Sequence, residues 1–239
     1  LKIINENKGF EYTDYTLYWL AEIEIRLGHG DEARKLLFSI IKSFPKFGWI
    51  DYTYYLLGLL DFEFNRFSQA EASFKKVPLL SKNDELVQDS LFWLGLLSFR
   101  QKDYEGTIRY LKTLWEDPKL LPHGYLKYAL FWLGEAHLRL GQFSDATLNF
   151  KTFHQRFKND PLIPEVQWRL GLCEYHSGNF KEAIEIFQGL KSQLKESPLL
   201  FSTHYLLGRM FLLNRDPSAS IGEINSAIYT SPANPLTGI

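Results

Sequence analysis

Histidine and cysteine are the side chains of this 239-residue sequence most able to hold a metal ion or to act as a nucleophile. The six histidines are His29, His123, His137, His154, His176 and His204. None of them belongs to an HExxH pattern or to a CxxC-type ligand set. The single cysteine, Cys173, lies in an expected helix with no partnered base in sight, so a packing role is favoured. We therefore expect no enzymatic activity, no metal and no cofactor.

Aromatic and cationic residues form a second set, because these two types most often carry binding energy at protein interfaces. Aromatic residues make up 16% of the chain, and one series recurs every 37 to 39 residues: Tyr18, Tyr55, Phe92, Phe131, Trp168 and Tyr205. Arg100 and Arg139 each lie eight residues beyond a member of this series, about two helical turns further on. An aromatic stripe at helical spacing serves packing as often as binding, so both interpretations stay open.

Small residues follow the same interval and place these positions on a repeated structural unit. A Leu-Gly or Leu-Ala pair recurs at Leu20-Ala21, Leu57-Gly58, Leu94-Gly95, Leu133-Gly134, Leu170-Gly171 and Leu207-Gly208. Twelve residues after each small member comes Ala, Thr or Ser, and four residues later comes a large apolar residue such as Leu37 or Phe150. Facing small residues let two antiparallel helices approach closely, and the large residue fills the space beside them. The pattern predicts six hairpins, each made of two antiparallel helices.

Turn residues separate the two helices of each predicted hairpin. Gly28, Asn65, Gly141 and Gly178 occupy one equivalent position, where a left-handed residue is typical of a helix C-terminus. Two residues later an aromatic residue recurs in four hairpins, as in Phe143, and acids or serine then open the second helix.

These features resemble the tetratricopeptide repeat (TPR) family. The matching residues are the Leu-Gly pair, the aromatic and alanine of GNFKEA and GQFSDA, and the phenylalanine four residues further on. The resemblance covers roughly residues 14–232 and implies an all-α, right-handed α-solenoid of about six TPR helix-turn-helix repeats, starting near residues 14, 51, 88, 127, 164 and 201. Ile3-Ile4 match Ile40-Ile41, so residues 1–13 are expected to end a preceding repeat. Residues 233–239 are expected to be a disordered or truncated tail.

The resemblance also implies a function. In TPR proteins the position of the six aromatic residues faces the concave groove that the first helices form. We therefore expect a scaffold that binds a peptide, a helix or a partner domain in an aromatic groove, with Arg100 and Arg139 pairing acidic residues of the ligand. The alternative is a structural subunit of a periplasmic ring or of a motor or pilus complex, such as a flagellar collar, that assembles through its repeat ends.

Residues 129–171 are similar to the repeats of bacterial cell-envelope proteins. These include the periplasmic coordinator of the Tol–Pal system and the TPR lipoprotein of the outer-membrane β-barrel assembly machine, which share the 37-residue step and the aromatic before the Leu-Gly pair. The similarity implies a periplasmic protein, free or membrane-anchored, with the cytoplasm as the alternative. The sequence begins at Leu1 without an initiating methionine, so we expect a fragment of a longer precursor.

Overall charge and hydropathy narrow the choice of partners. A net charge of −1 disfavours a general nucleic-acid binder, which needs surplus Lys and Arg to displace counterions. No apolar run approaches the roughly 18 residues that cross a bilayer. The expected partners are therefore proteins or peptides, with self-assembly as a further form of association.

Overall fold

The computed structural model describes residues 12–116, 125–194 and 197–230. Within these ranges every regular element is a helix, which confirms the all-α prediction. The predicted remnant of a preceding repeat falls on residues 1–13, of which only 12 and 13 are described, and the predicted tail at 233–239 lies outside the described residues. None of the described helices combines the length and the hydropathy needed to span a membrane.

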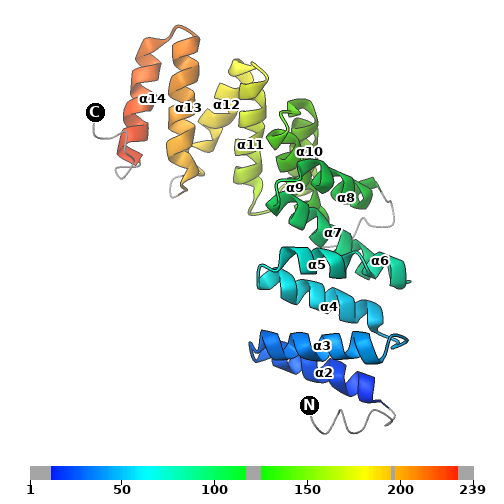
Figure 1. Ribbon diagram of the computed structural model, residues 1–239. Coiled ribbons are helices and arrows are strands. Elements are labelled where there is room, and N and C mark those ends of the chain that lie inside the picture. The colour runs from blue at the N-terminus through cyan, green and yellow to red at the C-terminus, as the bar shows by residue number, and fades with distance from the viewer. Residues whose placement is uncertain (1–11, 117–124, 195–196, 231–239) are drawn as a thin grey trace. The chain divides into compact units, whose positions relative to one another are not determined.

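The chain divides into two compact units, residues 1–125 and 126–239. The helices of unit 1 are α2 (Thr13–Arg26), α3 (Gly30–Ser43), α4 (Ile50–Glu63), α5 (Phe67–Phe74), α6 (Val77–Leu80), α7 (Asp84–Arg100) and α8 (Tyr104–Glu116). The helices of unit 2 are α9 (Leu126–Arg139), α10 (Phe143–Arg156), α11 (Ile163–His176), α12 (Phe180–Leu190), α13 (Leu199–Leu213) and α14 (Pro217–Thr230). Each unit holds three hairpins, in which a first helix pairs with the helix that follows it (Figure 1).

Close helix crossings hold each hairpin together. A Cβ atom added to Gly58, Gly134 or Gly171 would lie only 2.6 to 2.7 Å from a ring carbon of the phenylalanine sixteen residues later. The absent side chain is therefore what lets the ring of the second helix sit directly on the backbone of the first. The predicted pairing of small and large residues is present in the structure.

Each first helix ends in the same hydrogen-bonded turn. The second residue after each of these helices has a positive φ in all six hairpins: Gly28 (79°), Asn65 (57°), Lys102 (63°), Gly141 (72°), Gly178 (81°) and Arg215 (60°). Two crossed backbone hydrogen bonds accompany this residue, for example Gly141 N to Leu138 O at 3.1 Å and Gln142 N to His137 O at 2.9 Å. This is the Schellman arrangement, which satisfies carbonyl groups at the end of the helix and reverses the chain.

The second hairpin departs from the pattern, because its second helix is broken into α5 and α6. Pro78 has no N–H group and cannot donate to the carbonyl of Phe74, where α5 ends. Ser90 of α7 donates its hydroxyl to that carbonyl instead, at 3.0 Å. α7 itself begins four residues before the expected repeat start near 88, because the Asn83 side chain accepts hydrogen bonds from Glu85 N and Leu86 N.

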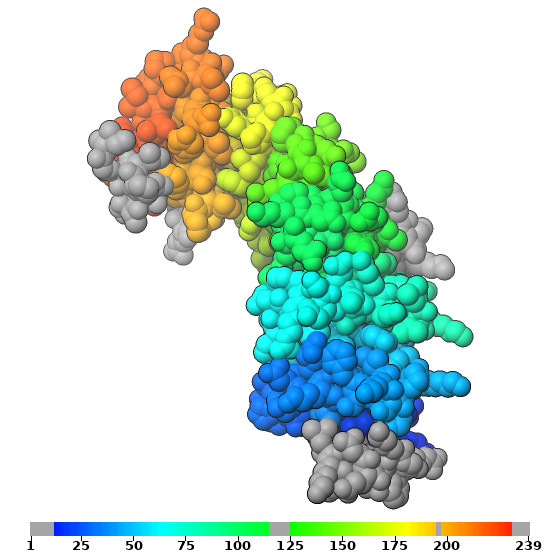
Figure 2. All heavy atoms as spheres, viewed as in Figure 1, coloured from blue at the N-terminus to red at the C-terminus, as the bar shows by residue number. Residues whose placement is uncertain are grey.

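Hairpins stack through apolar side chains within each unit. In unit 1 the first core cluster includes Leu17, Leu37 and Ile40 of the first hairpin together with Leu57 and Leu60 of the second. Figure 2 shows the first hairpin (blue) in contact with the second (cyan) over a continuous surface. Neighbouring hairpins therefore bury one another, as the logic of helical repeats requires.

Candidate functional site

The six predicted aromatic residues lie on the first helices, and three of them are covered by the protein itself. Tyr18, Phe92 and Phe131 expose only 7%, 4% and 7% of their surface. The ring of Phe92 stacks on Tyr125 with 4.6 Å between centroids, and that of Tyr18 packs against Phe47 at 6.1 Å. These residues pack between elements of their own unit.

The other three aromatic residues are less buried and combine packing with hydrogen bonds. Tyr55 accepts a hydrogen bond from Trp93 Nε1 at 3.2 Å, and its burial raises the pKa of the phenol. Trp168 donates from Nε1 to Thr203 Oγ1 of the next first helix at 3.1 Å. Tyr205 exposes 38% of its surface. Five of the six residues therefore pack between elements of their own unit, whereas Tyr205 stacks on Phe201 of the same helix. Contact of the series with a partner stays a prediction.

Unit 2 contains a groove that brings two of the predicted site residues together. It has a volume of about 570 Å³ and lies between α9 and α11, beside the turn that precedes α10. Its lining residues are Glu135, Leu138, Arg139, Gly141, Phe143, Trp168, Arg169, Leu172 and His176. The groove joins Arg139 and Trp168 of the predicted set to polar residues that were not in it.

Glu135 is the buried centre of the groove's charges. It exposes only 4% of its surface. One carboxylate oxygen accepts from Arg139 Nη2 at 3.2 Å and the other accepts from Arg169 Nε. A buried carboxylate requires such partners, because desolvation strongly disfavours an unpaired charge. Two arginines are therefore held in the groove by one acid, and Arg139 still exposes 57% of its side chain.

Two further contacts fix the shape of the groove. The guanidinium of Arg169 lies 4.7 Å above the ring centroid of Phe131 and also pairs with Glu165 at 2.9 Å. The His176 ring stacks on Phe143 with 5.2 Å between centroids and 9° between planes. Phe131 thus supports the groove from beneath, while Phe143 and His176 form a flat aromatic wall.

Arg169 is the site residue that the sequence interpretation missed. Its repeat position carries Trp19, Trp93 and Trp132 in three other hairpins. A charged residue at a position where aromatic residues recur is a signal that comparing the repeats column by column would have found. Glu135 holds a repeat position where both neighbouring hairpins carry leucine. His176 holds a position where the preceding hairpin carries Arg139 and the following one carries Leu213.

Arg100, the other predicted arginine, lies in unit 1. Its guanidinium is 5.0 Å from the ring centroid of Phe62 and 5.7 Å from that of Phe67. Cation–π contacts of this kind contribute about 0.5–1 kcal/mol at exposed sites. Arg100 therefore caps an aromatic pair of the second hairpin.

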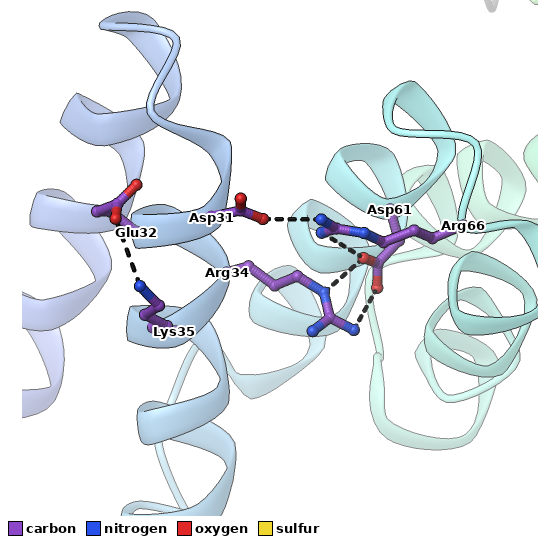
Figure 3. Close-up of polar contacts among 6 residues, drawn as sticks. All are labelled: Asp31, Glu32, Arg34, Lys35, Asp61 and Arg66. Atoms are coloured by element: carbon purple, nitrogen blue, oxygen red, sulfur yellow. Dashed lines mark hydrogen bonds and ion pairs between the residues drawn. The ribbon is translucent and has the colours of Figure 1, made fainter.

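A second polar cluster ties the first two hairpins together (Figure 3). Asp61 of α4 is fully buried and accepts from Arg34 Nε of α3 at 2.6 Å. Arg66 Nη1 lies 3.7 Å from the same carboxylate, and Arg66 Nη2 donates to Asp31 at 2.7 Å. The hydrogen bond from Arg66 lowers the pKa of Asp31. The charges of this cluster pair with one another, although the buried Arg66 Nη1 makes no hydrogen bond. We assign the cluster a structural role, because its ion pairs join the first two hairpins.

Two further kinds of chemistry were considered from the sequence, a metal-binding set and the Cys173 thiol as a nucleophile. Within the described ranges no three His, Cys, Asp or Glu side chains gather as a metal-binding set. Cys173 is buried, and this burial raises the pKa of its thiol to about 11. At neutral pH the thiol is therefore protonated and a poor nucleophile.

Solved structures of low sequence identity share this fold. A tetratricopeptide repeat protein from Parabacteroides merdae ATCC 43184 has a TM-score of 0.66 and 15% identity, over 91% of this chain and 79% of its own. YrrB, described as a TPR protein with an unusual peptide-binding site, has a TM-score of 0.63 and 17% identity, over 82% of this chain and 93% of its own. MamA (41-end) from Desulfovibrio magneticus RS-1 has a TM-score of 0.62 and 17% identity, over 77% of this chain and 97% of its own.

Family models match the sequence directly. Two models, both described as tetratricopeptide repeat, match residues 133–199 in one case and residues 15–46 and 89–119 in the other. Together they cover more than half of the chain, while no curated protein matches the sequence. The family models, the repeated hairpins and the solved neighbours agree, and the chain belongs to the tetratricopeptide repeat family.

Proposed function

We propose that the chain is a protein-binding scaffold whose groove between α9 and α11 holds an apolar segment of a partner that carries acidic residues. The observation that carries the proposal is the pairing of an aromatic wall with two arginines fixed by the buried Glu135. Aromatic and arginine side chains are the types that most often dominate binding energy.

Preorganisation supports this role for the groove. Arg139 is tethered to Glu135 at 3.2 Å yet remains more than half exposed, so some of its donors can reach a ligand carboxylate. Trp168 and Phe143 offer apolar surface beside it. Because these groups are already positioned, binding loses little side-chain entropy. The similar structure YrrB is described as having an unusual peptide-binding site, which supports a peptide-like ligand for this groove.

A random-peptide display library, selected on the purified chain, tests the proposal. We expect the enriched peptides to combine apolar residues with aspartate or glutamate. Arg139→Glu should weaken binding of an enriched synthetic peptide at least about tenfold, which corresponds to about 1.4 kcal/mol. Arg100→Glu is the matched control, since Arg100 is an exposed arginine at the equivalent repeat position in unit 1.

Two outcomes would contradict the assignment. Equal loss with Arg100→Glu and Arg139→Glu would show that general charge, rather than this groove, attracts the peptides. Enrichment of basic peptides would mean that Glu135 and Glu165 dominate recognition instead of the arginines. Circular dichroism of each variant is needed to show that its fold is retained.

We also propose that the partner belongs to a bacterial cell-envelope assembly, with the protein in the periplasm or anchored to a membrane there. The similarity of residues 129–171 to the repeats of envelope proteins supports this setting. Osmotic-shock fractionation of the source organism, followed with an antibody against this chain, tests it. Recovery of the protein with cytoplasmic markers would overturn the compartment without affecting the groove.

A further inference from the structure

The groove between α9 and α11 continues as an aromatic surface toward α13, the first helix of the next hairpin (Figure 1). Trp168, which lines the groove, donates its indole N–H to Thr203 of α13 at 3.1 Å. His176, also part of the lining, has its ring 5.2 Å from that of Tyr175. The guanidinium of Arg209, on α13, lies over the Tyr175 ring at 5.8 Å. Direct contacts therefore connect the lining of the groove to α13.

Arg209 is an exposed arginine supported by two aromatic rings. Its guanidinium lies 5.8 Å from the ring centroid of Tyr175 and 5.8 Å from that of Tyr205. Tyr205 in turn stacks on Phe201, with 9° between the ring planes. A guanidinium that lies over aromatic faces keeps its five N–H donors, because these point outward in the plane of the group. Arg209 can therefore bind an anionic group of a ligand while it stays on this aromatic support.

The repeat register brings different chemistry to each of three neighbouring first helices. α9 contributes Arg139, which is tethered to the buried Glu135 and exposes 57% of its side chain. α11 contributes apolar surface from Trp168 and Leu172. α13 contributes Arg209, at the repeat position of Glu135 and Leu172, with a step of 37 residues each time. Because Glu135 and Leu172 both line the groove, Arg209 faces the same side, and an apolar strip lies between two exposed arginines.

We propose that the partner segment crosses α11 in an extended conformation and carries two acidic residues, one bound by Arg139 and the other by Arg209. An apolar residue between the two acids contacts Trp168 and Leu172. The inference rests on the function proposed above, since it describes the ligand of the same groove. Charge complementarity selects this occupant, because arginine forms strong, charge-assisted hydrogen bonds with carboxylates. Two separated arginines therefore favour two separated acids over a single acidic residue.

The spacing of the helices sets the spacing of the two acids. α9 and α11 are joined by the contact of Glu135 with Arg169, and α11 and α13 by that of Trp168 with Thr203. Helices in side-chain contact lie about 8–10 Å apart, so the two steps from α9 to α13 span about 16–20 Å. An extended chain advances about 3.3–3.6 Å per residue and covers this span in about five or six residues. The ligand should therefore carry an acidic–apolar–acidic pattern of that length.

Peptides enriched from the display library on the purified chain test the pattern. Most should carry two acidic residues about five or six positions apart, with apolar residues between them. One such synthetic peptide, labelled for fluorescence anisotropy, is the probe. Replacing either acid by its amide should weaken binding, and Arg209→Gln should weaken it at least about threefold. Lys181→Gln is the matched control, because Lys181 is an exposed cation on α12 outside the groove lining, and it should leave binding unchanged.

Charge exchange between protein and peptide shows which acid meets which arginine. Arg209→Glu should be rescued by a peptide in which one acid is replaced by arginine, and Arg139→Glu by a peptide changed at the other acid. Rescue of both variants by the same replacement would overturn the proposal.

The remaining outcomes separate this inference from the proposed function. Enriched peptides with a single acid, or loss of binding with Arg139→Glu but not with Arg209→Gln, would overturn the second contact and leave the groove between α9 and α11 as the binding site. A lower unfolding midpoint of Arg209→Gln with unchanged binding would reduce Arg209 to a packing residue. Unchanged binding by both variants, or no enriched peptide at all, would overturn the proposed function as well.

Discussion

Glycine residues at the helix crossings set how closely the two helices of a hairpin approach. A Cβ atom on Gly134 would lie 2.6 Å from a ring carbon of Phe150, well inside normal contact distance. Phe150 is itself fully buried and cannot swing away. Gly134→Leu is therefore expected to destabilise the fold by about 1–3 kcal/mol or more, and to do so more than any single substitution in the groove. Urea unfolding monitored by circular dichroism measures this difference.

Gly189 provides the comparison for this substitution. It lies in α12, and a Cβ atom added there would meet no other atom within 4 Å. Gly189→Leu should leave the unfolding midpoint unchanged or raise it, because leucine is the better helix former. Equal urea unfolding midpoints for Gly134→Leu and the parent would contradict the close crossing of α9 and α10.

Lys102 holds a conformation that suits glycine better. Its φ of 63° matches those of Gly28, Gly141 and Gly178 at the equivalent position. Left-handed geometry costs an L-residue about 1–2 kcal/mol of folding free energy. Glycine avoids this cost, but it loses more conformational entropy on folding, which offsets part of the gain. We expect Lys102→Gly to stabilise the protein by about 0.5–1 kcal/mol in chemical denaturation. Gln101→Gly, one residue earlier with a φ of −80°, should destabilise it instead.

The turns also show what residue types can and cannot predict. Gly28, Asn65, Gly141 and Gly178 indicated left-handed positions because these residue types adopt them readily. Lys102 carries no such preference. Its conformation comes from the flanking hydrogen bonds, Lys102 N to Phe99 O at 3.0 Å and Asp103 N to Ser98 O at 2.8 Å. Only the repeat register, rather than the residue itself, could have located that turn.

Among the elements, the last hairpin depends on one partly buried carboxylate. Burial acts to raise the pKa of Glu223, but the contacts with Lys191 Nζ at 2.7 Å and His204 Nδ1 at 2.6 Å outweigh it and hold the pKa below its ordinary value of 4.5. A lowered folded-state pKa means that the stability it contributes is present above pH 4.5 and is lost as the pH falls through the folded value.

This linkage predicts an acid-sensitive α14. Unfolding midpoints measured from about pH 6 down to about pH 3 should fall less steeply for Glu223→Gln than for the parent, because the variant has no proton to gain at this site. The variant should be the less stable protein at the upper end of that range. Parallel curves for the two proteins would show that the contacts with Lys191 and His204 contribute nothing to folding.

The helices were predicted well where residue types recur at the repeat interval. They were predicted less well where a single residue interrupts a helix. Six hairpins follow from the recurrence of small and large residues, since that spacing reports a helix crossing directly. The break between α5 and α6 depends on two residues. Pro78 has no N–H group to donate to the carbonyl of Phe74, and the hydroxyl of Ser90, which lies on α7, donates to that carbonyl instead. Such a long-range replacement has no local signature.

The candidate site shows the same limit. Periodicity places Phe92, Phe131 and Trp168 on one face of successive first helices. It does not tell which of them the next hairpin covers, and Phe92 and Phe131 are in fact buried. The ion pair of Glu135 with Arg139 is local, four residues apart in one helix. The pair of Glu135 with Arg169 joins residues 34 positions apart, so it appears only once the hairpins are stacked.

At the scale of the whole molecule, stability should follow the number of neighbours that each hairpin has. A repeat array gains most of its stability from the interfaces between adjacent units rather than from each unit alone. The α2–α3 and α13–α14 hairpins are the outermost hairpins of their respective units among the described residues. Each also leaves apolar residues exposed, Ile23 in the first case and Ile221 in the second.

Hydrogen exchange at low protein concentration, where association is minimal, checks this expectation. Amide protection should be lower in α2 than in α4 within unit 1, and lower in α14 than in α11 within unit 2. Among the described residues, the hairpins of α2 and α14 each have one neighbouring hairpin in their unit, whereas those of α4 and α11 have two. Protection that is uniform through Ile224 at low concentration would contradict the nearest-neighbour description of the array. It would show instead that each unit unfolds as a single cooperative block.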